Sequence, residues 1–258
     1  MFTLGVVSYL NALPLYRPLE ARGEVAVERA VPAKLAGMLE SGECDAAIMP
    51  VVDFLRGFGS QIISDACIGT KVDGDGAVQS VLLFHREPLE NVQSVAVDTS
   101  SHSSVALTRV LLADAFGVLP PFTEHEPDLP AMLEEHEAAL LIGDGALEAA
   151  RDNPSTPVLD LGVAWKNHTG LPFVFAAWIA RSNLSESDAR ELGRLLSESR
   201  DEGLANLSKI VAGNPIATTL SDAQIEKYLH EAVEFHFSAA HRAGLEEFRR
   251  RCEKHNLL

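Results

Sequence analysis

The sequence has few cysteines and few basic residues. Its 258 residues include three cysteines, Cys44, Cys67 and Cys252, which lie far apart and show no metal-binding spacing. An odd number of widely spaced cysteines is typical of reduced thiols rather than of a disulfide framework. Lys and Arg number 21 against 37 Asp and Glu, which gives a formal net charge of -16. This acidic excess argues against nucleic acid and against an anionic membrane surface as partners.

Long apolar runs and targeting segments are also lacking. No stretch approaches the ~18 uninterrupted apolar residues that a membrane-spanning helix needs. Met1 leads directly into the first expected strand, without a basic segment or a small-residue cleavage site, so we expect no signal peptide and a cytoplasmic protein. The nine histidines show no metal-ligand pattern, and the sequence has no glycine-rich phosphate loop. We therefore expect no bound metal ion.

Short apolar runs that alternate with helical patterns dominate the chain, of which 47% is hydrophobic. The first half reads as strands and helices in the order β-α-β-α-β, and the second half repeats this order. The expected strands are 4–7, 25–27, 46–49, 94–97, 122–124 and 138–142, and the expected helices between them are 13–21, 32–40, 101–115 and 129–134. Such an order predicts a parallel sheet with right-handed crossovers in each half.

The remaining segments connect the two halves and complete the chain. Two apolar runs, 62–67 and 78–84, can run between lobes, and 171–181 leads back out of the second lobe. Everything beyond Ser185 reads as helical, including helices near 222–239 and 243–255. We therefore expect an α/β fold of two lobes with a ligand cleft between them. Lobe I comprises residues 1–93 and 176–258, with the C-terminal helices, and lobe II comprises residues 94–175.

Polar side chains follow the first strand of each half. Ligands of parallel sheets bind at the carboxyl ends of the strands, so these side chains are candidate ligand groups. In the first half they are Ser8, Tyr9 and Asn11. Ser8 and Asn11 are either helix caps or ligand groups, and Tyr9 either packs in the core or faces the cleft. In the second half, Thr99, Ser101, His102, Ser103 and Ser104 open a helix. So many hydroxyls favour an anion site, with a carboxylate as its ligand, over a helix cap that needs only one of them.

Two other segments carry candidate residues. Asp144 lies between a strand and a helix, where it is either an N-cap or an acid, base or orienting group of the cleft. A predicted tight turn follows Lys166, His168 and Thr169, of which Lys166 reads as solvated surface. Thr169 and Gly170 suit a loop that approaches a ligand closely.

Several motifs together resemble the MqnA family of menaquinone biosynthesis. They are "VSYLNALPL", "DAAIMPVVDFL", "SSHSSVAL", "AALLIGD" and "TGLPFVFAAW", and the resemblance extends to "AGLEEFRRRCE" near the C-terminus. It implies a type II periplasmic-binding-protein-like fold and a chorismate dehydratase of the futalosine pathway, a lyase that makes 3-[(1-carboxyvinyl)oxy]benzoate and water. No cofactor is implied. The family usually has Ser-Arg-Thr-Ser where this sequence has Ser101, His102, Ser103 and Ser104.

The implied substrate is dianionic, so two anion sites are needed. The serine-rich helix start is one candidate, and the other draws on Ser8, Tyr9 and Asn11, on Ser80, or on Thr169 with Gly170. The catalytic candidates are Asp144 and Asn11. The base is either Asp144 or a carboxylate of the substrate itself, and the scarcity of basic side chains in the cleft loops favours the second.

Two other functions remain open. A passive protein of the same fold could bind a small carboxylate without reaction. The sister family, which makes dihydroxynaphthoate, shares the fold, but its first loop has a serine-proline-cysteine pattern that is absent here.

Overall fold

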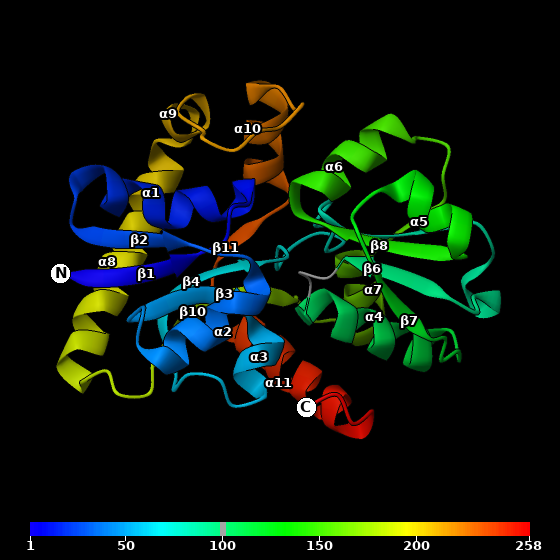
Figure 1. The fold of residues 1–258 in the computed structure, drawn as a ribbon, viewed down its shortest axis with the longest axis horizontal. Helices are drawn as coiled ribbons and strands as arrows, with labels where there is room; N and C mark the ends of the chain where they lie inside the picture. The colour runs from blue at the N-terminus through cyan, green and yellow to red at the C-terminus, as the bar shows by residue number, and fades with distance from the viewer. Residues whose placement is uncertain (99–101) are drawn as a thin grey trace.

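The computed structural model describes residues 1–98 and 102–258, and they form two β-sheets, each with helices packed around it (Figure 1). The first sheet has the strand order β11-β4-β10-β3-β1-β2, and the second has the order β7-β6-β8-β5-β9. The expected α/β fold of two lobes is therefore confirmed.

The strands of the first lobe are β1 (Phe2–Val6), β2 (Val25–Arg29), β3 (Ala46–Pro50), β4 (Ile62–Gly69), β10 (Val174–Ala180) and β11 (Glu234–His236). Its helices are η1 (Leu10–Ala12), α1 (Leu13–Arg22), α2 (Pro32–Ser41), α3 (Val51–Leu55), α8 (Glu186–Ala205), α9 (Leu207–Ala212), α10 (Asp222–Glu231) and α11 (Ala239–Lys254). The strands of the second lobe are β5 (Val81–His85), β6 (Val95–Asp98), β7 (Phe122–His125), β8 (Ala138–Ile142) and β9 (Val158–Asp160). Its helices are η2 (Leu89–Asn91), α4 (His102–Ala115), α5 (Leu129–Glu135), α6 (Gly143–Asp152) and α7 (Leu161–Thr169).

Each sheet has a core of three parallel strands, and antiparallel strands from other parts of the chain extend it. In the first sheet, β1 is parallel to β2 and β3, and β10 is antiparallel to both β3 and β4. In the second sheet, β6 is parallel to β7 and β8, whereas β5 is antiparallel to β8 and β9. The parallel cores are the β-α-β-α-β units that the sequence predicted. The loops after β1 and β6 are therefore the ones to examine for ligand groups.

The chain changes sheet earlier than the sequence predicted. Strand β5 lies within residues 1–93, which were assigned to lobe I, but it pairs with β8 and β9 in the second sheet. The crossing lies between β4 and β5, and the return lies between α7 and β10. The apolar run of β5 fits either sheet by composition, and only its partners decide where it belongs.

The C-terminal region is not wholly helical. The helix expected over residues 222–239 ends at Glu231, and β11 follows and pairs with β4. The sequence around β11 alternates, since Val233, Phe235 and Phe237 are buried while Glu234 and His236 between them are more exposed. This period of two is the pattern of a strand with one buried face.

The segment expected to be a ligand loop is helical instead. Residues 161–169 form α7, which Asp160 caps by accepting hydrogen bonds from the N–H groups of Gly162 and Val163. Gly170 ends the helix with φ +75°, a left-handed conformation that favours glycine. The glycine therefore marks a helix terminus rather than a close approach to a ligand.

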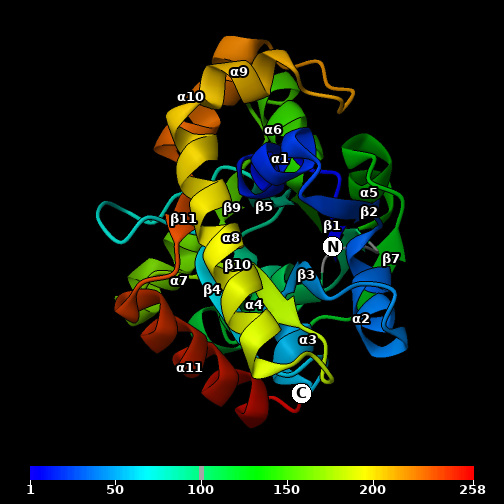
Figure 2. The ribbon, with the colours of Figure 1, turned by 90° about the vertical axis from the view of Figure 1, so that its left-hand side faces the viewer.

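Helices cover both lobes, and one of them joins the lobes. Helix α8 packs against α1 and crosses the sheet at β4, as Figure 2 shows. Helix α11 contacts α3 and β10 of the first lobe and α4 of the second. In the part of the chain that the structure describes, no helix has both the length and the apolar character that a membrane crossing requires.

Candidate active site

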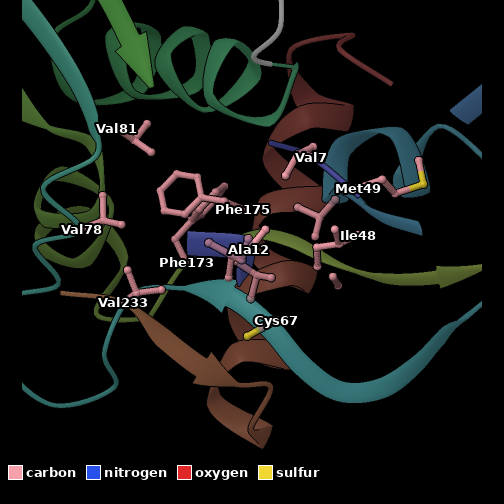
Figure 3. Close-up of a cluster of buried hydrophobic side chains, with 14 of the residues drawn as sticks. Val7, Ala12, Ile48, Met49, Cys67, Val78, Val81, Phe173, Phe175 and Val233 are labelled. Atoms are coloured by element: carbon pink, nitrogen blue, oxygen red, sulfur yellow. The ribbon is translucent and has the colours of Figure 1, made fainter. Parts of the chain in front are cut away.

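A cavity lies between the two lobes and takes in about 590 Å³ of atom-free space, part of it open to solvent. We call it the interlobe cavity. Five of its apolar residues belong to the cluster of buried side chains drawn in Figure 3. They are Val7, Ile48, Val78, Val81 and Phe175. The other lining residues are Tyr9, Asn11, Pro32, Pro50, Ile68, Ser80, His102, Ser103, Ser104, Ile142, Gly143 and Ala176.

The first lobe contributes Tyr9 and Asn11 to the cavity wall. Asn11 is 9% exposed and lies in η1, directly after the loop that follows β1. Its Nδ2 donates a hydrogen bond to the Tyr228 hydroxyl at 3.1 Å, while its Oδ1 is buried and has no partner among the described residues. No side chain caps η1, so Asn11 is not a cap. Ser8 is exposed and does not line the cavity.

Tyr9 brings the first lobe into contact with the second. Its ring lies over Gly143 at the start of α6, where an added Cβ would come within 2.7 Å of Tyr9 Cδ1. Gly143 has φ +60°, which a residue with a side chain adopts only at a cost. A glycine is therefore required here for two reasons, its backbone conformation and the close approach of the tyrosine.

The second lobe contributes the start of α4, where His102, Ser103 and Ser104 line the cavity. Two of these residues also contact α3 of the first lobe. His102 Nδ1 lies 2.8 Å from Asp53 Oδ2, and Ser103 Oγ accepts a hydrogen bond from the Val52 N–H at 3.2 Å. These contacts hold the lobes together beside the cavity. Two other predicted residues of this loop, Thr99 and Ser101, lie outside the described residues.

Ser80 lies on the connection between the lobes, just before β5. It is fully buried, and its Oγ accepts a hydrogen bond from the Tyr228 hydroxyl at 2.8 Å. Its backbone oxygen accepts from the Gly143 N–H at 2.7 Å. Ser80 therefore links the cavity wall to both the C-terminal region and the start of α6.

The described lining residues include no Lys or Arg. Among the lining residues that the structure describes, only His102 has a side chain that can carry a positive charge, and it already contacts Asp53. An anion in the cavity must therefore be held chiefly by hydroxyls and by the amino end of α4, where the helix dipole favours negative charge. In the described part of the chain, no group of three or more His, Cys, Asp or Glu residues could hold a metal ion.

Asp144 lies behind the cavity wall. Its carboxylate oxygens accept from the Leu10 N–H at 3.2 and 3.3 Å, which is a further contact between the lobes, and Asp144 is not among the lining residues. Burial raises the pKa of the Asp144 carboxyl to about 7, although the Leu10 N–H opposes the rise. The expected N-cap role is not observed, because Asp144 lies within the first turn of α6, whose N-cap is Ile142.

Thr169 and Gly170 do not line the cavity. The Thr169 hydroxyl donates to the Trp165 backbone oxygen at 2.8 Å and accepts from the Leu171 N–H at 3.1 Å. Both hydrogen bonds are local to the end of α7, so they account for the threonine without a ligand.

Sequence reasoning missed three residues of this region, Tyr228, Gly143 and Asp53. Tyr228 and Asp53 look like ordinary residues of helices, and nothing near them in the sequence indicates a partner in another segment. Gly143 had a signal, since a glycine between a strand and a helix often marks a positive φ.

The comparisons with known proteins agree on a family. A family model described as menaquinone biosynthesis matches residues 2–254. A chorismate dehydratase of Thermus thermophilus is 32% identical over 96% of this chain and 93% of its own length. One from Campylobacter jejuni is 25% identical over 98% of both chains. A 1,4-dihydroxy-6-naphtoate synthase of Thermus thermophilus is 29% identical, but over only 59% of this chain and 56% of its own.

Solved structures support the fold. A protein from Archaeoglobus fulgidus has a TM-score of 0.78 at 17% identity, covering 100% of this chain and 98% of its own. The periplasmic aliphatic sulphonate binding protein of Escherichia coli has a TM-score of 0.58 at 15% identity, covering 100% of this chain and 88% of its own. The expected periplasmic-binding-protein-like fold is therefore confirmed.

Proposed function

The chain belongs to the menaquinone biosynthesis family, and from this premise we propose that it is a chorismate dehydratase, which converts chorismate to 3-[(1-carboxyvinyl)oxy]benzoate and water. The observation that carries the proposal is the interlobe cavity, in a chain that aligns over nearly its whole length with curated enzymes of that name. A cytoplasmic location is part of the proposal. The three free and buried cysteines support a reducing compartment.

The cavity suits a small dianion that is held without a permanent cation. One carboxylate of chorismate binds at the amino end of α4, where Ser103 and Ser104 line the cavity. His102 lies at the same end and adds a positive charge when it is protonated. The apolar residues of the opposite wall pack against the ring.

The reaction needs orientation more than strong chemistry. One hydrogen leaves the ring carbon that carries the enol ether, the neighbouring carbon loses its hydroxyl, and the two leave together as water. The ring becomes aromatic, which provides the driving force. Holding the substrate in one conformation therefore accounts for much of the rate enhancement.

We place the base on the substrate rather than on the protein. Both oxygens of the Asp144 carboxylate face the Leu10 N–H, and the residue does not line the cavity. A carboxylate of bound chorismate takes the ring proton instead, and this proton then passes to the departing hydroxyl, so that water leaves and the carboxylate is regenerated. Asn11 Oδ1, which is buried without a partner among the described residues, accepts a hydrogen bond from the single hydroxyl of the substrate.

Turnover of chorismate by the purified protein tests the proposal. We expect chorismate to disappear and an aromatic product with the mass of 3-[(1-carboxyvinyl)oxy]benzoate to form. Asn11→Ala should lower kcat/KM by about 10²-fold, as expected for loss of a group that contacts the reacting atoms. The matched control is Asn91→Ala, an exposed asparagine of η2, which should retain wild-type activity.

Two results would overturn the proposal. Binding of chorismate without product would favour a passive carboxylate-binding protein. Turnover of cyclic futalosine in place of chorismate would favour the naphthoate synthase, whose similarity covers a smaller part of the chain.

A further inference from the structure

Tyr228 lies in α10, far along the chain from the loops that line the cavity, and its hydroxyl joins two of their residues. It accepts a hydrogen bond from Asn11 Nδ2 at 3.1 Å and donates one to Ser80 Oγ at 2.8 Å. All three residues are nearly or fully buried, with exposed fractions of 9% for Asn11, 0% for Ser80 and 4% for Tyr228. Asn11 and Ser80 line the cavity, whereas Tyr228 does not, so the tyrosine lies directly behind them.

The single hydrogen of the tyrosine hydroxyl gives this chain of hydrogen bonds a direction. An amide Nδ2 can only donate, so the Tyr228 oxygen accepts from it and its own hydrogen goes to Ser80. Ser80 Oγ has then accepted one hydrogen bond and has its own hydrogen left to donate. With Nδ2 held by Tyr228, Asn11 has Oδ1 left as an acceptor. Burial also raises the pKa of Tyr228, so the hydroxyl keeps its hydrogen.

We propose that Tyr228 is a positioning residue that sets Ser80 as a hydrogen-bond donor and Asn11 Oδ1 as an acceptor toward the ligand in the interlobe cavity. A ligand that matches this pair has a hydroxyl beside an oxygen that only accepts. On the proposed function, on which this step rests, the match is the hydroxyl of chorismate and the ether oxygen on the adjacent ring carbon. Without the Tyr228 hydroxyl, the Asn11 side-chain amide can flip and the Ser80 hydroxyl can rotate. The fixed arrangement of one donor and one acceptor toward the ligand is then lost.

The test is Tyr228→Phe, which removes the hydroxyl and keeps the ring. We expect kcat for chorismate to fall ~10-fold or more, as for loss of a group that orients reacting atoms, with a smaller change in KM. The matched control is Tyr16→Phe. Tyr16 is 1% exposed, belongs to α1 and does not line the cavity, so kcat should stay at the wild-type value even if thermal stability falls.

A second measurement separates positioning from general destabilisation. If Tyr228 acts through Asn11 and Ser80, Tyr228→Phe should have almost no further effect on kcat in a variant that already carries Asn11→Ala and Ser80→Ala. Multiplied losses in that background, or a kcat for Tyr228→Phe within about two-fold of wild type, would overturn the proposal.

A third measurement does not depend on activity. The side-chain NH₂ resonances of Asn11, assigned by ¹⁵N NMR, should shift in Tyr228→Phe and stay in place in Tyr16→Phe. If they shift but the wild type does not turn over chorismate, the proposed function fails and the positioning role stands. If they do not move, the positioning role fails whatever the protein does to chorismate.

Discussion

Gly143 of the second lobe lies under the ring of Tyr9 of the first lobe, beside the cavity. Its φ of +60° is unfavourable for a residue with a side chain, and the ring of Tyr9 leaves no space for a Cβ. Its neighbour Asp144 was the more conspicuous residue in the sequence, because a carboxylate suggests chemistry. In the structure the glycine lines the cavity and the aspartate lies behind it.

Gly143→Ala should therefore lower both stability and activity. The left-handed backbone costs alanine ~1–2 kcal/mol, and the added Cβ displaces Tyr9 from the cavity wall. Thermal unfolding and chorismate kinetics measure the two effects. Gly145→Ala is the control, since a Cβ there meets nothing within 4 Å and the residue lies inside α6. Equal behaviour of the two variants would contradict the role given to Gly143.

Asp144→Asn distinguishes the two hypotheses about the base. Because Asp144 does not line the cavity, we expect kcat to fall only a few-fold. A loss of ~10²-fold or more would instead support a side-chain base. The measurement is kcat for chorismate near pH 7, with the unfolding midpoint as a control for folding.

The same variant should change how stability depends on pH. The pKa of Asp144 is raised from 3.8 to about 7, so between these values the folded state binds the proton more tightly than the unfolded chain does. Wild-type stability should fall as the pH rises through this window, and the asparagine variant should lack that part of the fall. Urea unfolding at pH 5 and pH 8 measures it. A variant that loses as much stability as the wild type between these values would contradict the assignment.

At the scale of elements, α7 and β11 show where local pattern was insufficient or was misread. Thr169 and Gly170 read as part of a ligand loop because they suggest a turn, yet Thr169 is the last residue of α7 and the glycine ends that helix. Around β11 the alternation of buried and more exposed residues was present, but the preceding helical pattern was extended through it. In both places the error lay in where a helix ends. That end depends on the C-cap glycine of α7 and on the pairing of β11 with β4.

Thr169→Val tests the reassignment of that segment. The variant loses two local hydrogen bonds at the end of α7, so we expect stability to fall by ~1 kcal/mol. The KM for chorismate should not change, because Thr169 does not line the cavity. Denaturant unfolding and steady-state kinetics provide both values. A clear rise in KM with normal stability would contradict this reassignment and support the prediction that Thr169 approaches the ligand.

At the scale of the whole molecule, the two lobes are joined on more than one side. Beside the cavity they meet at Leu10 with Asp144, and at Asp53 with His102. Away from it, Asp114 in α4 accepts hydrogen bonds from Arg251 and Lys254 of α11. The two lobes are therefore held together both beside the cavity and away from it.

Asp114→Asn should weaken the link between α4 and α11. Burial alone would raise the pKa of Asp114, but hydrogen bonds from Lys254, His255 and Arg251 hold it well below its usual value. A lowered pKa gives stability that is present above the unfolded value near 4 and is lost as the pH falls toward the folded one. We expect a loss of ~2 kcal/mol at pH 7 and less at pH 3, measured by urea unfolding.

Asp152→Asn is the control for this effect, because the Asp152 side chain is exposed and pairs only with its neighbour Arg151 among the contacts described. An exposed pair contributes little because solvent screens it, so the stability of this variant should stay close to that of the wild type. Similar losses in the two variants would show that Asp114 does not join the lobes.

The sequence by itself determined the two β-α-β-α-β units, because hydrophobic periodicity is a local property. Position after a strand, which is also local, singled out Asn11, His102, Ser103 and Ser104, and the structure places all four in the cavity wall. Only the tertiary structure assigned β5 to the second sheet, placed Asp144 behind the wall and removed Thr169 from the site. It alone brought Tyr228 between Asn11 and Ser80. The physical reason is that a hydrogen bond between distant segments depends on how helices and sheets pack. The sequence around either partner therefore does not predict it.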